Sequence, residues 1–130
     1  MRAVDRNPII LGIISDTHGL LREEALLALK GSDLIIHAGD VGNPEIIQTL
    51  KSLAPVFVVR GNVDTEPWAK ALPESEVIEA GLATIYVLHD VHALDLDPAA
   101  AGFHIVVSGH SHKPASTEHG GVLFLNPGSA

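Results

Sequence analysis

Five short apolar runs, rich in β-branched residues, most limit what this chain can fold into. They cover residues 9–14, 34–36, 56–59, 84–88 and 104–107. Each run is too short for a buried helix and suits a buried strand. Because such strands must be covered on both faces, the runs predict a sheet-based core with helices packed outside it.

Two helical patterns separate the first three runs. Residues 20–30 carry apolar side chains at helical spacing, and Gly31 follows as a C-terminal cap. Asn43-Pro44-Glu45 provides an N-cap, a first-turn proline and a first-turn acid for a helix that ends at about residue 50 or 51. The alternation of strand and helix predicts a parallel sheet in this half of the chain.

The pattern changes after Asp64. Residues 76–80 and 82–88 flank Gly81 and predict an antiparallel hairpin, and Gly120-Gly121 joins a second one between residues 115–118 and 122–125. A short surface helix is expected over residues 94–101. We therefore predict one α/β domain over residues 1–130, with a mixed sheet or two sheets face to face.

Composition excludes several classes of function. The chain has 16 acidic and 8 basic residues and a net charge of −8, which argues against binding to duplex DNA. It has no cysteine, so any metal must be held by oxygen and imidazole nitrogen. No stretch is typical of a signal peptide or a membrane span, so we expect a cytoplasmic protein that does not bind membranes.

A residue that can bind a metal follows each of the five runs. The carboxyl ends of parallel strands are the usual ligand-binding edge of an α/β sheet, so these side chains should meet. The candidates are Asp16, His18, Asp40, Asn62, His89, His110 and His112. Seven ligands exceed what one catalytic ion takes, but two ions that share a bridging carboxylate could use them all. Oxygen and imidazole ligands suit Mn²⁺, Fe or Zn²⁺.

The charge of such a site favours phosphate chemistry. Two divalent ions and two aspartates leave a positive surplus that can hold a hydroxide and attract a phosphate. Gly39, Gly61 and Gly109 directly precede three of the ligands, where we expect the strand end to need a residue without Cβ restrictions. The turn at residues 126–129 could pack beside the site.

Six motifs resemble those of the calcineurin-like metallophosphoesterases, and in particular of the small YfcE-type phosphodiesterases. The resemblance runs in the correct order from about residue 9 to residue 129. The motifs are Ser15-Asp16-Thr17-His18-Gly19, His37-Ala38-Gly39-Asp40, Arg60-Gly61-Asn62-Val63-Asp64, Leu88-His89-Asp90, Ser108-Gly109-His110-Ser111-His112 and Asn126-Pro127-Gly128-Ser129.

The resemblance implies a β-sandwich of mixed sheets flanked by helices, and a role for each ligand. Asp16, His18 and His112 would hold one metal, and Asn62, His89 and His110 the other. Asp40 would bridge them, and Asp40, Asn62 and His89 would serve catalysis. The implied reaction is the hydrolysis of a small phosphodiester by a hydroxide that bridges the metals. Mn²⁺ is the first choice of metal, with Fe, Zn²⁺ or Ni²⁺ as alternatives.

The sequence departs from the family pattern at three places. Val63 stands where many relatives have a histidine that helps to protonate the leaving group, and Asp64 could replace it only if it were neutral. His92 is shifted from the position of a second histidine that the small branch often has after His89. The chain ends at Ala130, where relatives continue into further strands, so the resemblance implies an exposed sheet edge that another copy of the chain covers, or a truncated product.

Other interpretations of these residues stay open. The resemblance allows a phosphomonoesterase, or a protein-assembly scaffold like the retromer-subunit branch, although that branch typically lacks part of the ligand set. Arg60 could reach a substrate phosphate or form an ion pair. We expect His37 to orient its loop rather than bind metal, and Trp68 to cover the core.

Overall fold

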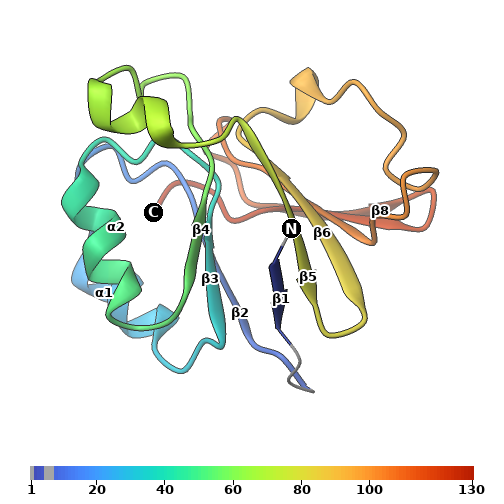
Figure 1. Cartoon of the computed structure of the whole chain (residues 1–130), viewed down its shortest axis with the longest axis horizontal. Coiled ribbons are helices and arrows are strands. Elements are labelled where there is room, and N and C mark those ends of the chain that lie inside the picture. Colours follow the sequence, from blue (N-terminus) through green and yellow to red (C-terminus); the bar gives the residue numbers. More distant parts are fainter. Residues whose placement is uncertain (1, 5–7) are drawn as a thin grey trace.

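The first of two sheets contains three parallel strands. In the computed structural model, which describes residues 2–4 and 8–130, its order is β2 (Leu11–Ile14), β3 (Leu34–His37) and β4 (Val56–Val58). Helices α1 (Glu23–Leu29) and α2 (Pro44–Lys51) connect the strands and cover the outer face of this sheet (Figure 1). The predicted parallel half is confirmed.

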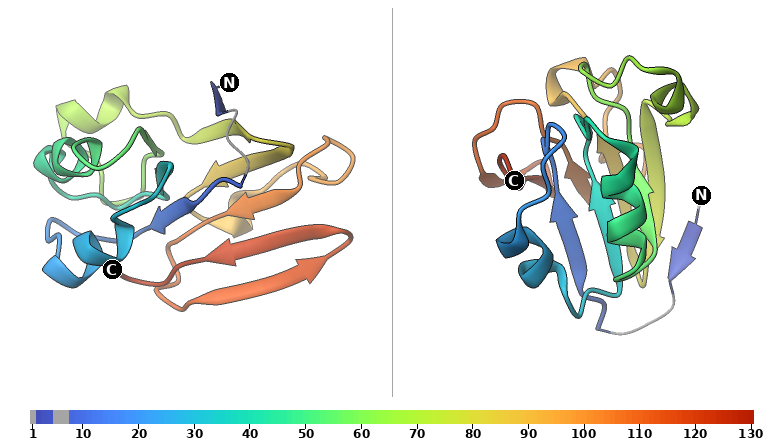
Figure 2. Two further views of the ribbon diagram at one scale, coloured as in Figure 1. Left: turned by 90° about the horizontal axis from the view of Figure 1, so that it is seen from below. Right: turned by 90° about the vertical axis from the view of Figure 1, so that its left-hand side faces the viewer.

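The second sheet is mixed and has six strands. Its order is β1 (Arg2–Val4), β5 (Ser75–Ala80), β6 (Ala83–Leu88), β7 (Ile105–Val107), β9 (Val122–Asn126) and β8 (Ala115–His119). The pairs β5–β6 and β8–β9 are the two predicted antiparallel hairpins, while β7 runs parallel to β6 and β9. In Figure 1 the helices, the first sheet and the second sheet follow one another from left to right, and in the right view of Figure 2 the helices lie in front of the first sheet.

Two apolar cores hold these layers together. Leu34 and Ile36 of β3 pack with Ile78 and other residues of the second sheet, whereas Ile35 between them packs with Leu50 of α2. Both faces of β3 are therefore buried, which is why its sequence is an unbroken apolar run. Each such side chain contributes roughly 1.5–3 kcal/mol on burial, and this fixes the strand ends that carry the site.

Three local features differ from the expectation. No helix forms over residues 94–101: the Asp97 carboxylate accepts the N–H groups of Ala99 and Ala100 and caps a single turn, which Gly102 (φ 86°) ends. The 3₁₀ helices η1 (Pro67–Ala71) and η2 (Val91–Ala93) were not expected. Strand β1 was not expected either, because its pairing with β5 is made by the backbone and its sequence shows no apolar pattern.

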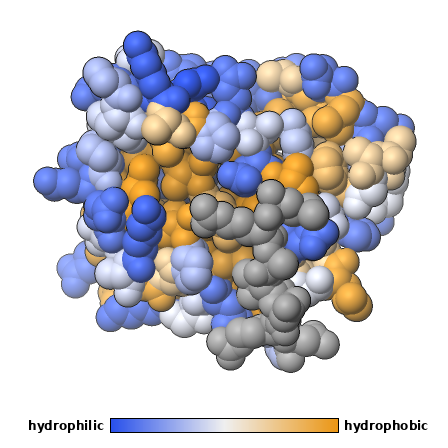
Figure 3. All heavy atoms as spheres, in the orientation of Figure 1, coloured by the Kyte–Doolittle hydropathy of each residue, from blue (hydrophilic) through white to orange (hydrophobic). Residues whose placement is uncertain are grey.

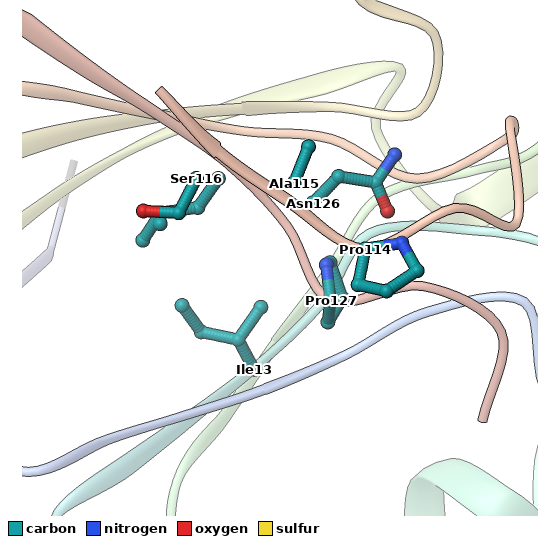
Figure 4. Close-up of a pocket in the computed structure, with 7 residues that line it drawn as sticks. Ile13, Pro114, Ala115, Ser116, Asn126 and Pro127 are labelled. Carbon is teal, nitrogen blue, oxygen red and sulfur yellow. The ribbon is translucent and has the colours of Figure 1, made fainter. Parts of the chain in front are cut away.

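An apolar cavity of about 420 Å³ separates the edge of β2 from the β8–β9 hairpin. Ile13, Pro114, Leu125 and Pro127 line it with carbon (Figure 4). It offers little that could hold an ion, so the chemistry of the chain lies elsewhere.

The outer surface mixes polar and apolar side chains. On the face drawn in Figure 3, hydrophilic residues surround scattered apolar patches, as is usual for a folded protein. Among the described helices, none is both long and apolar enough to cross a bilayer.

Candidate metal centre

Loops from both sheets meet at one edge of the molecule. Three of these loops follow β2, β3 and β4, and two follow β6 and β7 of the second sheet. His89 Nε2 lies 3.2 Å from Asp40 Oδ2 and 4.0 Å from Asp16 Oδ1, so residues far apart in the sequence share one pocket. The predicted convergence is therefore correct, although two sheets rather than one supply the strands.

One group of potential ligands contains Asp16, His18 and His112. Their ligand atoms all lie within 4.8 Å of one another. His112 Nε2 is 3.3 Å from Asp16 Oδ1 and 3.2 Å from His18 Nε2. Two imidazole nitrogens that face a buried carboxylate at these distances form a suitable donor set for a divalent cation.

A second group contains Asp40, His89 and His110, again with ligand atoms within 4.8 Å. Asn62 belongs beside it, since its Oδ1 lies 3.0 Å from His89 Nε2 and 3.2 Å from His110 Nδ1. Asp40 Oδ2 is also 3.7 Å from His18 Nε2 of the first group. Asp40 therefore lies between the two groups.

One buried oxygen of Asp16 has no hydrogen-bond partner among the described residues, which indicates a binding site for a cation. Asp16 is 1% exposed, and its Oδ2 accepts from Ser15 Oγ at 2.5 Å and from the His110 N–H at 3.0 Å. Its Oδ1 has no hydrogen-bond partner in the described chain. A buried unsatisfied carboxylate oxygen is costly. A cation among the imidazoles of His18, His89 and His112 would satisfy it, so the residues present fit a metal.

His89 is already oriented to use its outer nitrogen. Its Nδ1 lies 2.8 Å from the Ala38 carbonyl oxygen, which can only accept, so Nδ1 carries the proton. The Nε2 lone pair then points toward Asp40 and Asn62. The group that orients His89 is a backbone carbonyl, which leaves no signal in the sequence.

The backbone is strained at the candidate ligands. Five non-glycine residues of the described chain have positive φ, and all five belong to the predicted metal site. They are Asp16 (56°), His18 (49°), Asp40 (58°), His110 (70°) and His112 (62°). Left-handed backbone costs roughly 1–2 kcal/mol at such residues. Strain that gathers at one pocket is typical of a functional site.

Glycine is required directly before these ligands for two different reasons. Gly39 has φ 102°, as expected for a position that excludes a Cβ. Gly61 and Gly109 do not have positive φ, and a Cβ is excluded there for lack of space. A Cβ at Gly61 would overlap Asp40, and one at Gly109 would overlap Ser15 and Asp16. These two glycines allow neighbouring loops to approach closely.

Asp64 holds the loops together and is not placed to donate a proton. It is 3% exposed and accepts the N–H groups of Val41 (3.1 Å), Gly42 (3.0 Å) and Gly61 (3.0 Å). Both oxygens are thus occupied as acceptors. Its sequence position beside Val63 gave no indication of this role.

The remaining singled-out residues take structural roles. Arg60 pairs with Glu74 at 2.7 Å, and exposed His92 hydrogen bonds to Asp90. The backbone N–H of His92 is the main cause of a lowered pKa of Asp90. The turn at 126–129 does pack beside the site, because the Asn126 amide donates to Gly109 O at 2.9 Å. Trp68 packs against the core between α2 and the first sheet, as expected.

His37 is neutral and fully buried, as expected for a residue that orients its loop. Its Nδ1 accepts from the Gly39 N–H at 3.1 Å, and its Nε2 lies 3.0 Å from the Thr17 hydroxyl, which donates to Val41 O. Burial lowers the pKa of His37 from 6.5 to about 4, against the opposing pull of Asp64 and Asp16. The site loops therefore rest on an uncharged imidazole.

The pKa of His37 predicts an acid-sensitive fold. Between pH 6.5 and about 4 the unfolded chain binds a proton that folded His37 does not, so stability falls as the pH falls. The loss reaches about 3 kcal/mol near pH 4. We expect the His37→Gln variant to lose about 2 kcal/mol less than the wild type between pH 7 and pH 4.5. Urea unfolding in chelator measures this, with exposed His119→Gln as the control; equal losses in all three proteins would contradict the assignment.

Comparison with known proteins agrees with this geometry. Residues 9–130 match the calcineurin-like phosphoesterase superfamily domain. A probable metallophosphoesterase of Methanothermobacter thermautotrophicus is 35% identical in an alignment of 132 positions that covers 93% of this chain and 77% of that protein.

Two solved structures are also similar. An archaeal phosphodiesterase has a TM-score of 0.76 and 26% identity, over 92% of this chain and 83% of its own. Vps29 of Entamoeba histolytica, in complex with zinc, has a TM-score of 0.76 and 31% identity, over 92% of this chain and 74% of its own. The β-sandwich predicted from the motifs is confirmed, and together with the His/Asp groups the family indicates a site for divalent metal. The chain belongs to the calcineurin-like phosphoesterase superfamily.

Proposed function

We propose that this chain is a phosphodiesterase that depends on two divalent metal ions. The observation that carries the proposal is the pair of His/Asp groups around the unsatisfied Asp16 Oδ1. Similarity to an archaeal phosphodiesterase supports the choice of diesters within the superfamily.

Each ligand keeps the role that the motifs imply. Asp16, His18 and His112 would hold one ion, Asn62, His89 and His110 would hold the other, and Asp40, which lies between the two groups, would serve both. We propose Mn²⁺ as the ion, as the resemblance implies; a donor set of oxygen and imidazole also suits Fe or Zn²⁺. When bound, the ions supply Lewis acidity and lower the pKa of water enough for attack on phosphorus near neutral pH.

The protein's own groups bind the substrate but do not protonate its leaving group. The Asn62 amide is exposed and can donate to a phosphoryl oxygen while its Oδ1 faces His89 and His110. Val63 is 44% exposed and has no ionisable group, and Asp64 is occupied by three N–H donors. The site therefore favours alcohols that depart readily as anions.

Metal content and turnover test this function directly. The protein is purified without chelator, the bound metal per chain is measured, and hydrolysis of bis-p-nitrophenyl phosphate is followed with and without added Mn²⁺. We expect two ions per chain and Mn²⁺-dependent turnover that chelator abolishes. Metal-independent turnover, or fewer than two bound ions at saturation, would contradict the proposal.

The leaving group provides a second prediction. Without a general acid, the wild type should hydrolyse an alkyl methyl phosphate at least about 100-fold more slowly than p-nitrophenyl methyl phosphate. This ratio of rates should be larger in the wild type than in the Val63→His variant. In that variant an imidazole stands at the exposed position next to Asn62, and the gap should narrow. Equal rates on both esters in the wild type would show that another group donates the proton.

A scaffold function is the second candidate. Its support is the similarity to Vps29, which covers 92% of this chain. Stoichiometric metal binding with no turnover of any aryl diester or monoester would favour the scaffold. A preference for p-nitrophenyl phosphate over the diester would instead favour a phosphomonoesterase.

A further inference from the structure

A cavity of about 700 Å³ opens beside the metal centre. Asn62 and His89, two of the proposed ligands, form part of its wall. This volume is that of a small-molecule site. A phosphodiester whose phosphorus lies at the metals would therefore place one of its alcohol groups in this cavity.

The charge of the cavity wall depends on one ion pair. Arg60 is the only arginine or lysine among the described residues that line it, whereas four carboxylates do so: Asp64, Glu74, Asp90 and Asp95. Asp64 is committed to backbone N–H groups. The Arg60 backbone N–H donates to Pro73 O at 2.7 Å, which aligns Arg60 with Glu74, and their side chains meet at 2.7 Å.

The pair compensates the charge of Arg60, and among the described residues of the wall the acidic side chains stay in excess. Asp90 hydrogen bonds to His92, and its Oδ2 lies 3.8 Å from His110 Nε2, while Asp95 is exposed at the rim. Tyr86 and Leu88 add apolar surface to the same wall. A wall of carbon whose four carboxylates outnumber its one described arginine suits uncharged or alkylammonium groups and repels anions.

We propose, building on the phosphodiesterase function, that Glu74 determines the substrate class. By holding Arg60, it makes this cavity a subsite for the uncharged or cationic alcohol of a phosphodiester, and excludes an anionic alcohol. Arg60 would bind an anionic alcohol if Glu74 did not occupy it. Glu74 is a specificity residue and not a catalytic one, since in the described structure it contacts Arg60 and none of the proposed metal ligands.

Three p-nitrophenyl diesters of similar size test the proposal. Their second alcohols are choline, 3,3-dimethylbutanol and 4-hydroxybutanoate, which are cationic, uncharged and anionic. All three release the same leaving group, so the chemical step is matched. We expect kcat/KM to fall in that order, by at least about tenfold from the first ester to the last at low salt, and the difference to shrink in 0.5 M salt.

Variants of the ion pair separate its role from general electrostatics. Glu74→Gln should raise kcat/KM for the anionic ester about fivefold and change the uncharged ester less than about twofold. Because the Glu74 side chain is 83% exposed and screened by water, most of this gain should act through Arg60. In an Arg60→Gln background the gain should therefore fall below about twofold. Glu74→Asp, which keeps the charge, should keep the wild-type order.

The controls distinguish the two ways of failing. Glu66→Gln removes an exposed carboxylate that does not line the cavity, and should leave all three rates unchanged. If Mn²⁺ activates hydrolysis of the esters but charge or Glu74→Gln has no effect on their order, this inference is wrong and the proposed function stands. If none of the three esters is hydrolysed with Mn²⁺, the proposed function fails and the inference fails with it.

Discussion

Replacing Asp40 by asparagine is expected to reduce Mn²⁺-dependent hydrolysis of an aryl phosphodiester by more than about 100-fold. This exceeds the roughly 10–100-fold loss that is typical when a residue that only supports a metal ligand is replaced. Asp40 lies between the two ligand groups, with Oδ2 at 3.2 Å from His89 Nε2 and 3.7 Å from His18 Nε2. An amide carries no charge and cannot bridge two cations. Bound metal should therefore fall from two ions per chain to one or none.

The fold should survive this substitution, which makes the result interpretable. The asparagine oxygen can still accept the Val63 N–H, now at 2.9 Å from Asp40 Oδ1. The variant also loses one of the three buried carboxylates of the described chain, so in chelator it should melt no lower than the wild type. Asp97→Asn, remote from the site, is the control for losing a carboxylate. Two tightly bound ions and full turnover in Asp40→Asn would show that Asp40 does not bridge.

Much of the fold could be predicted because the signals are local. The β-branched runs become β2, β3, β4, β6 and β7, since their side chains are buried on both faces and the sequence must be apolar at successive positions. Asn43 caps α2 as predicted, because its side chain accepts the Glu45 N–H at 2.9 Å. These features depend on neighbours in the chain.

The same reasoning predicted where the site lies, but it did not predict the contacts that hold the ligands in place. Strand ends and polar residues predicted that Asp16 and His110 would lie together, and the His110 N–H indeed donates to Asp16 Oδ2. The Ala38 carbonyl behind His89 and the three N–H donors to Asp64 are set by tertiary packing. No local pattern records them, and the motifs gave no indication that Asp64 holds the loops together.

Backbone conformation was the other hidden element. A histidine or aspartate adopts positive φ only where the surrounding structure imposes it. Here the imposing contacts are backbone hydrogen bonds between loops, such as Asp16 N to Gly39 O and His18 N to Asp40 O. The sequence shows which residues could ligate a metal, whereas these contacts decide how they are aimed.

The close approach of the loops leads to a second large effect, at Gly109. A methyl group there would overlap Ser15 Oγ and Asp16 Oδ2, both fully buried. The backbone cannot retreat easily, since Gly109 N donates to His89 O at 2.8 Å and Gly109 O accepts from Asn126. We expect Gly109→Ala to displace the Asp16 carboxylate, weaken metal binding at least about tenfold and destabilise the fold by about 1–3 kcal/mol.

Gly102→Ala separates crowding from backbone strain. Gly102 has φ 86° with open space around its would-be Cβ, whereas Gly109 has no positive φ and is crowded. Gly102→Ala should therefore lose about 1 kcal/mol of stability and keep wild-type metal affinity. Calorimetric titration with Mn²⁺ and thermal melts in chelator measure both quantities. If Gly109→Ala loses stability but binds Mn²⁺ as the wild type does, the close approach of Gly109 does not hold Asp16 in place. Another contact must then position the ligand group of Asp16, His18 and His112.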